Sequence, residues 1–271
     1  VRSRGLGDVY KRQGLRSIQR KGSNSFEALN EPIILDGPYS NSAFDIVCKN
    51  DKVYMIIGGK DLLNGKRFDK GGYILTYDYD KWSFIDPKEA QKKLNLPRNP
   101  RDYTSIAVTT DDSNDEIVYA SSMGDGVIQY KNGTPVQSYN EKNAFKETAG
   151  GYGSGYCYID GLAFDKNGNL WMTSSEVNHA VLVLDKAGAW HRLDIEQLRG
   201  VYTINDILIT STNDKWIYVP RNTPKLVMIP NSESLDEVSS YEFTTLIDTD
   251  GKELTPSNYT CVAEDKDGYI W

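Results

Sequence analysis

Apolar and polar residues alternate along most of the chain, and short runs of Asp, Asn, Lys and Gly interrupt the alternation. Segment 159–171 shows the full pattern: an alternating run, a turn from Asp165 to Gly168, and a second run that ends at Trp171. Alternation with a period of two predicts half-buried β-strands. Asn-Gly between two such runs predicts a tight hairpin, because both residues accept a positive φ.

The same strand–turn–strand unit recurs along the sequence. A close copy spans 259–271 and turns between Asp265 and Gly268, and a looser copy spans 202–216. The copies end at aromatic residues that lie 45 to 65 positions apart, namely Tyr54, Tyr119, Trp171, Trp216 and Trp271. We interpret the Asp, Gly and Trp positions of the repeat as structural: Asp165, Gly168, Trp171, Trp216, Asp265, Gly268 and Trp271.

The length of the repeat indicates the fold class. A period of about fifty residues with four strands per unit is typical of β-propeller blades. We therefore predict an all-β fold, a β-propeller with four-stranded blades. Four blades and the start of a fifth do not close a ring, so we expect a fragment of a larger propeller or of a propeller pair. One short helix is predicted at 86–94, with Asp86 as its N-cap and Pro87 at its first position.

The two ends of the chain suggest where the domain lies. Residues 3–13 resemble the translation of a sequencing adapter, so we expect residues 1–13 to be a non-native segment. Residues 14–29 are predicted as a linker or partial strand, and 30–271 as the propeller domain, truncated at the C-terminus within a blade. Residues 1–13 carry a net charge of +3, so the rest of the chain carries −10.

Composition and motifs exclude several classes of function. A net charge of −7 argues against binding to duplex nucleic acid. Three widely spaced Cys and two His form neither a disulfide framework nor a zinc motif, and the common hydrolase and phosphate-loop motifs do not occur. No apolar run is long enough for a transmembrane segment. We therefore expect no cofactor, no metal site and no catalytic residues, and predict a protein that is not an enzyme.

Five residues are candidates for ligand binding. The Gly-rich loop 149–158 carries Tyr152, Tyr156 and Tyr158, whose flat amphipathic rings suit a sugar or a protein surface. The alternative is that these rings pack against the neighbouring blade. Asp160 and Asp206 precede the inner strands of two predicted blades, where they could face the central channel. Without an evident partner they do not predict a glycosidase.

The Asp-rich turns and the cysteines have simpler interpretations. The turns at 165–168, 248–251 and 265–268 resemble the opening of a calcium loop but lack the remaining ligands. We predict hairpin turns capped by their own Asp side chains. Cys48 and Cys261 fall inside predicted inner strands, so we expect buried free thiols.

Two sets of motifs carry a family resemblance. The turns that lead to Trp171 and Trp271 resemble the two-component regulator propeller repeat of Bacteroidota proteins. The order of further features resembles the PorZ-like proteins of the type IX secretion system: Ile57-Gly-Gly59, then VYASSMGDGV at 118–127, then QSYNEKN at 137–143. This resemblance covers roughly residues 30–271.

The resemblance implies a function that the residues themselves do not reveal. PorZ-like proteins carry two propellers and a secretion-signal domain, and they are implicated in delivering anionic lipopolysaccharide to a sortase at the cell surface. The resemblance therefore implies a surface or periplasmic propeller that binds anionic lipopolysaccharide, another glycan or that sortase. The alternative is the periplasmic glycan-sensing propeller of a hybrid histidine kinase. In such sensors a Gly-Thr pair tends to follow the Trp, whereas Met172 and Ile217 follow it here, which favours the PorZ-like interpretation.

Overall fold

The computed structural model describes residues 18–28, 37–40, 42–62, 65–79, 81–145, 155–232, 234–247 and 250–271. The predicted all-β propeller fold is confirmed, because these residues form four antiparallel four-stranded blades. Blade 1 holds β3 (Ala43–Lys49), β4 (Lys52–Ile57), β5 (Ile74–Asp78) and β6 (Lys81–Ile85). Blade 2 holds β7 (Tyr103–Thr110), β8 (Glu116–Gly124), β9 (Gly126–Lys131) and β10 (Thr134–Tyr139).

The second half of the chain repeats this arrangement. Blade 3 holds β11 (Cys157–Phe164), β12 (Leu170–Ser174), β13 (Val181–Leu184) and β14 (Trp190–Leu193). Blade 4 holds β15 (Ile207–Ile209), β16 (Lys215–Val219), β17 (Lys225–Ile229) and β18 (Tyr241–Phe243). Two small hairpins stand outside the blades: β1 (Ile18–Arg20) with β2 (Phe26–Ala28), and β19 (Leu246–Ile247) with β20 (Glu253–Leu254).

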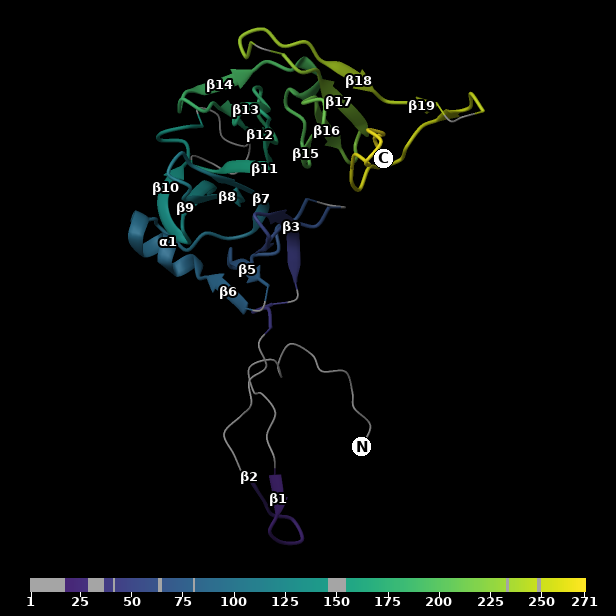
Figure 1. Ribbon diagram of the computed structural model, residues 1–271. Helices are drawn as coiled ribbons and strands as arrows, with labels where there is room; N and C mark the ends of the chain where they lie inside the picture. Colours follow the sequence, from purple (N-terminus) through teal and green to yellow (C-terminus); the bar gives the residue numbers. More distant parts are fainter. Residues whose placement is uncertain are drawn as a thin grey trace.

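The blades follow one another around an open arc, with their first strands β3, β7, β11 and β15 on the inside (Figure 1). Blades 2 and 3 are also joined by strand pairing, since the end of β8 pairs with the start of β11 through Cys157–Gly124 and Tyr158–Met123.

The hydrophobic core lies between neighbouring blades rather than inside any one of them. Each of three buried clusters draws side chains from two adjacent blades. Ile56 and Ile106 belong to the cluster of blades 1 and 2, and Trp171 and Ile217 to that of blades 3 and 4. A single sheet cannot bury both of its faces alone, so each blade depends on its neighbours for stability.

The up-and-down strand order gives the arc two distinct faces. The turns after the first and third strands of each blade lie on one face, which we call the turn face. The connections after the second and fourth strands lie on the other, the loop face. One of these connections contains α1 (Pro87–Leu94), whose predicted N-cap is confirmed, because the Asp86 side chain accepts a hydrogen bond from Lys88 N.

Two of the three predicted Asp-rich turns are held by their own side chains, and the third, at 248–251, begins with residues outside the described part of the chain. Asp165 Oδ1 accepts hydrogen bonds from the backbone N of residues 167 and 169, and Oδ2 accepts one from Trp171 Nε1 at 2.9 Å. Asp265 makes the same set of bonds, including one from Trp271 Nε1 at 2.8 Å. In the turn after β13, His191 takes the place of the Trp and contacts Asp185 Oδ2 at 2.9 Å. The carboxylates are thus occupied in closing hairpins.

One expectation about the cysteines is wrong. Cys48 lies in the inner strand β3, as expected, but both Cys48 and Cys261 are exposed, and only Cys157 is buried. Alternate residues of β3 are covered less completely than those of β7 or β11, because only blade 2 packs against blade 1 among the described blades.

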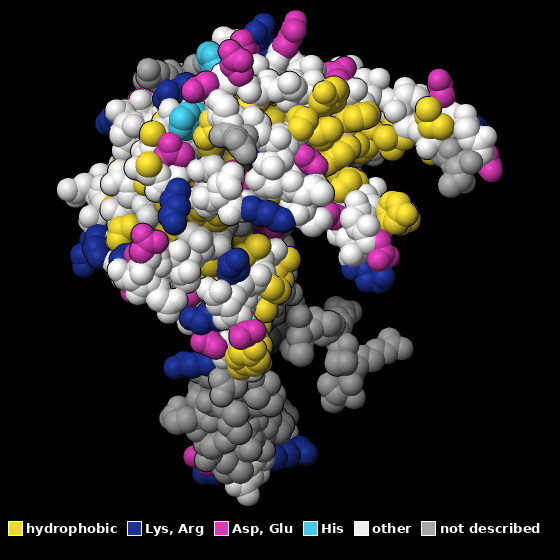
Figure 2. Space-filling model, turned by 45° about the horizontal axis from the view of Figure 1, so that its top comes forward, with side chains coloured by type: hydrophobic (Ala, Val, Ile, Leu, Met, Phe, Trp, Pro, Cys, Tyr) yellow, Lys and Arg dark blue, Asp and Glu magenta, His cyan; other side chains and the backbone are white. Residues whose placement is uncertain are grey.

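Hydrophobic side chains also reach the surface near the end of the described chain. Figure 2 shows them gathered over the fourth blade. The exposed hydrophobic residues in this part of the chain include Tyr241, Ile247, Leu254, Tyr269 and Trp271. No helix in the described parts of the chain has the length and apolar character needed to span a membrane.

Candidate functional site on the loop face

Three aspartates come together where the inner strands begin. Asp45 lies in β3, Asp160 in β11, and Asp206 immediately before β15. Asp45 Oδ2 accepts hydrogen bonds from Ser105 Oγ at 3.2 Å and from the backbone N of residue 106 at 3.1 Å. Gly161 lies directly against Asp206, because a Cβ added to this glycine would stand 2.6 Å from Asp206 Oδ1. The absence of a side chain at this position therefore lets blades 3 and 4 approach closely.

A lysine from blade 1 neutralises one of these acids. Lys60 follows β4, and its Nζ forms an ion pair with Asp160 Oδ1 and donates a hydrogen bond to Ile204 O at 3.1 Å. Ser175 Oγ donates to Asp160 Oδ2 at 2.6 Å, and Lys60 Nζ stands 5.0 Å from the centre of the Tyr158 ring. The side chains of Lys60 and Asp160 are 1% and 0% exposed, so water does not screen the pair.

The excess of carboxylates and their burial shift the pKa values of Asp160 and Asp206. Burial raises the pKa of Asp160 to about 6, although Lys60 and Ser175 act in the opposite direction. Burial and the nearby carboxylates of Asp45 and Asp160 together raise the pKa of Asp206 to about 7. The cluster holds three carboxylates against one ammonium group, so Asp206 has no cation of its own to favour its charged form.

We expect the Asp206→Asn variant to be more stable than the wild type at pH 8, by at least about 1 kcal/mol. The pKa of Asp206 is higher in the folded state than in the unfolded chain, so its stabilising contribution is complete below about pH 4 and is lost as the pH rises through 7. Asn keeps the oxygen that accepts the bond from the backbone N of residue 207. Thermal melts at pH 5 and pH 8 test this.

The gain should shrink at pH 5, where Asp206 itself is protonated. The matched control is Asp112→Asn, because the Asp112 side chain is 96% exposed. This substitution should change the melting temperature little at either pH. An equal effect of Asp206→Asn at both pH values would contradict the assignment.

The Lys60 ion pair also anchors a hairpin that crosses to the far side of the arc. Residues 60 and 67 form an antiparallel bridge, and Asp61 N donates to Lys66 O at 2.8 Å. Near its tip, Gly65 lies against blade 4, because a Cβ there would stand 2.8 Å from the Arg221 guanidinium. We call the described residues 60–62 and 65–67 the crossing hairpin. It links blade 1 to blades 3 and 4 on the loop face.

A strip of basic residues begins at the base of this hairpin. Segments 66–72 and 98–102 lie side by side through the Gly71–Arg101 bridge and the hydrogen bond from Gly72 N to Pro100 O. The two segments carry five basic side chains, which we call the basic ridge: Lys66, Arg67, Lys70, Arg98 and Arg101.

Three carboxylates hold the ridge in place. Asp102 is fully buried and accepts hydrogen bonds from Arg67 Nε and from the backbone N of residues 69 and 70. Asp125 pairs with Arg98 at 2.8 Å, and Asp69 pairs with Arg67 at 3.0 Å. Five cations against three carboxylates leave a net positive strip on an acidic protein.

An aromatic ring lies within the ridge. Phe68 is 46% exposed, and Lys70 Nζ stands 5.4 Å from its ring centre. The side chains of Arg98 and Arg101 are about half exposed, at 48% and 50%. An exposed ring flanked by cations offers both an apolar surface and charge-assisted hydrogen bonds to a ligand.

The structure buries Tyr158 and leaves Tyr156 half-buried. Tyr158 is 2% exposed and packs with Met123, and the Tyr156 ring meets it edge-on with centroids 6.4 Å apart. These contacts match the packing alternative. Tyr152 lies outside the described residues.

The acidic cluster is only partly accessible to solvent. Asp160 is enclosed by Lys60 and Ser175, and Asp206 is only partly exposed. Within the described parts of the chain, no set of three or more His, Cys, Asp or Glu is arranged to hold a metal ion. In the ridge, by contrast, the Arg98 and Arg101 side chains are about half exposed.

Sequence reasoning found Asp160, Asp206 and Tyr158 but missed Asp45, Lys60 and the ridge. The structure brings the first three together around Lys60. The density of Lys and Arg in residues 60–72 and 98–101 was an available signal, because the rest of the chain is acidic.

Comparison with solved structures supports the fold assignment. PorZ of Porphyromonas gingivalis, described as an essential bacterial surface component of the type IX secretion system, superposes with a TM-score of 0.75 at 20% identity. The match covers 96% of this chain and 34% of PorZ, so the chain spans about a third of that protein.

A sensor-type structure matches less well. The extracellular domain of a protein described as a hybrid two-component system from B. thetaiotaomicron gives a TM-score of 0.50 at 12% identity, over 90% of this chain and 27% of that one. No protein-family model matches the sequence, and a search of curated protein sequences gives no match. These similarities establish the propeller fold.

Proposed function

We propose that this chain is a non-enzymatic propeller of the cell surface or periplasm that binds an anionic glycan through the basic ridge. The observation that carries the proposal is the ridge itself, a positive strip around exposed Phe68 on a protein of net charge −7. Phosphate and carboxylate groups of a glycan suit arginine and lysine, and a sugar ring suits the aromatic surface.

Anionic lipopolysaccharide of the type IX secretion system is the ligand we propose, and the sortase that attaches it to cargo is the protein partner. The superposition with PorZ over nearly the whole chain supports this choice. The acidic cluster would repel an anion, so the channel is not part of the proposed site.

A glycan-sensing propeller of a hybrid histidine kinase is the second candidate. The similarity to the two-component extracellular domain favours it, at a lower TM-score than that of PorZ. The two candidates differ in the ligand, because a sensor would be expected to recognise a soluble oligosaccharide rather than lipopolysaccharide.

Lys70→Glu/Arg101→Glu is expected to weaken binding to purified anionic lipopolysaccharide about tenfold or more, since two charge-assisted contacts become repulsive. Biolayer interferometry on immobilised lipopolysaccharide measures this, and raised salt should weaken wild-type binding. The matched control is Lys49→Glu/Lys186→Glu, which makes the same charge change on the turn face and should leave binding unchanged. Absence of wild-type binding, or equal binding by the ridge variant, would overturn the proposal.

A further inference from the structure

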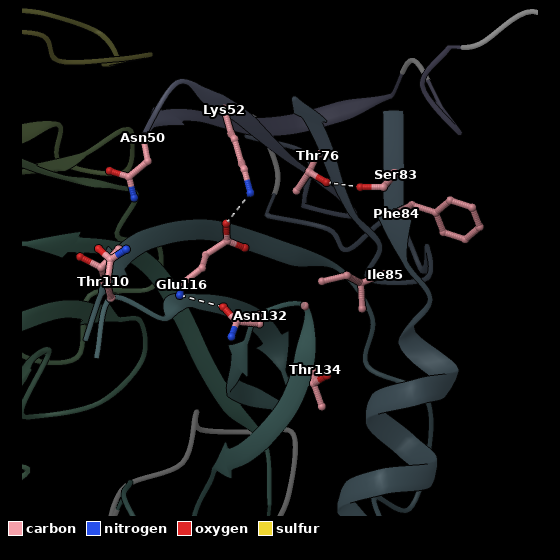
Figure 3. A pocket seen from close by; sticks show the side chains of 12 residues that line it. Asn50, Lys52, Thr76, Ser83, Phe84, Ile85, Thr110, Glu116, Asn132 and Thr134 are labelled. Carbon is pink, nitrogen blue, oxygen red and sulfur yellow. Dashed lines mark hydrogen bonds and ion pairs between the residues drawn. The ribbon is translucent and has the colours of Figure 1, made fainter. Parts of the chain in front are cut away.

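A polar groove opens between blades 1 and 2 (Figure 3). It lies on the turn face, whereas the basic ridge lies on the loop face. Its volume is about 780 Å³, which lies within the range of about 300–1,000 Å³ typical of small-molecule sites. Its walls come from the β3–β4, β7–β8 and β9–β10 turns and from the facing strands of the two blades.

The floor of the groove is a fixed carboxylate. Glu116 Oε2 accepts a hydrogen bond from Tyr54 Oη at 2.5 Å and one from Lys52 Nζ at 3.2 Å. Both bonds end on the same oxygen, and the other carboxylate oxygen points toward the middle of the groove in Figure 3. The acceptor is therefore held in position before any ligand arrives, which lowers the entropic cost of binding.

Amides and hydroxyls form the rest of the lining. Asn50 and Asn114 lie in hairpin turns with φ of 51° and 64°, and both are exposed at the rim. Asn132 is fixed by bonds from the backbone N of Glu116 and to Asp115. Hydroxyl groups come from Thr76, Ser83, Thr110 and Thr134, and Ile85 adds an apolar surface.

This chemistry selects one class of ligand. Lys52 is paired with both Glu116 and Asp78, so its charge does not attract an anion to the groove. The ring of Phe84 points away from the middle of the groove, so it offers no stacking surface there (Figure 3). A carboxylate with several amides and hydroxyls matches the donor and acceptor pattern of sugar hydroxyls. We propose that the groove binds a neutral oligosaccharide, at a site separate from the ridge.

The test uses short neutral oligosaccharides of the cello, manno and chito series, titrated calorimetrically into the whole chain. Asn50→Gly/Asn114→Gly removes both rim amides and keeps the positive φ, so the turns should remain intact. We expect at least about tenfold weaker binding than for the wild type. Asn222→Gly is the matched control, because it makes the same change at a φ of 63° in the connection between β16 and β17 on the loop face.

A second variant, Thr134→Trp, fills the groove and should abolish binding while circular dichroism confirms the fold. The proposal is overturned if none of these oligosaccharides binds the wild type, or if binding survives both variants. The ridge variant Lys70→Glu/Arg101→Glu should bind the oligosaccharide as the wild type does. The oligosaccharide titration therefore tests the groove, and the lipopolysaccharide assay tests the ridge, each without depending on the other.

Discussion

Replacement of Lys60 by Met is expected to lower the free energy of unfolding by about 3–5 kcal/mol at pH 8. Met has nearly the length of Lys and keeps most of the packing, but it leaves the Asp160 carboxylate buried without a cation. The hydrogen bond from Lys60 Nζ to Ile204 O is lost as well. Denaturant titration followed by fluorescence measures the loss.

The cost should be smaller at pH 5 than at pH 8. Burial already raises the pKa of Asp160 to about 6 with Lys60 present, so an unpaired Asp160 takes up a proton more readily. The double variant Lys60→Met/Asp160→Asn should recover most of the lost stability, because no buried charge remains. Lys66→Met, on the same hairpin but exposed, is the matched control. A loss below about 1 kcal/mol for Lys60→Met at pH 8 would show that the pair does not hold the fold together.

Trp171→Ala should destabilise the protein by a similar amount, about 3–5 kcal/mol. Trp171 is 1% exposed and packs in the cluster between blades 3 and 4, so its loss leaves a large cavity. The change also removes one of the two hydrogen bonds to Asp165 Oδ2, leaving only the one from Asn169 Nδ2, and it removes the ring over which Lys215 Nζ stands at 4.6 Å. Lys215 is itself buried, so the loss of its contact with the ring adds to the loss of stability.

The repeat supplies a matched control for this prediction. Trp271 makes the same bond to its own Asp but is 77% exposed, so Trp271→Ala should cost far less. Trp171→Phe keeps most of the ring and loses the indole N–H, so it should cost about 1–2 kcal/mol. Equal losses for Trp171→Ala and Trp271→Ala would mean that the turn bond, rather than burial, carries the effect.

Local chemistry explains why the blades could be predicted from the sequence. Strand alternation and Asp-x-x-Gly turns depend on residues a few positions apart, and Asp165 indeed caps its own turn. The helix was predictable for the same reason, because Asp86 and Pro87 define its start without help from distant residues.

The candidate site could be predicted only in part, because its partners are distant in the sequence. Lys60 meets Asp160 across 100 positions, and the two segments of the ridge meet only once blades 1 and 2 have packed together. Exposure was hard to predict as well: Cys48 and Tyr158 both lie in inner strands, yet only Tyr158 is covered by a neighbouring blade. Strand pattern alone does not say which neighbour covers a residue.

The crossing hairpin has a consequence for how the molecule loses its structure. In a chain of blades that touch only their neighbours, the end units can peel away one at a time. Lys60, at the base of the crossing hairpin, instead connects blade 1 to positions 100 and 144 residues further along, in blade 3 and in the segment that leads into blade 4. Blade 1 therefore cannot detach without breaking contacts at the opposite side of the arc, and we expect the four blades to unfold in one cooperative transition.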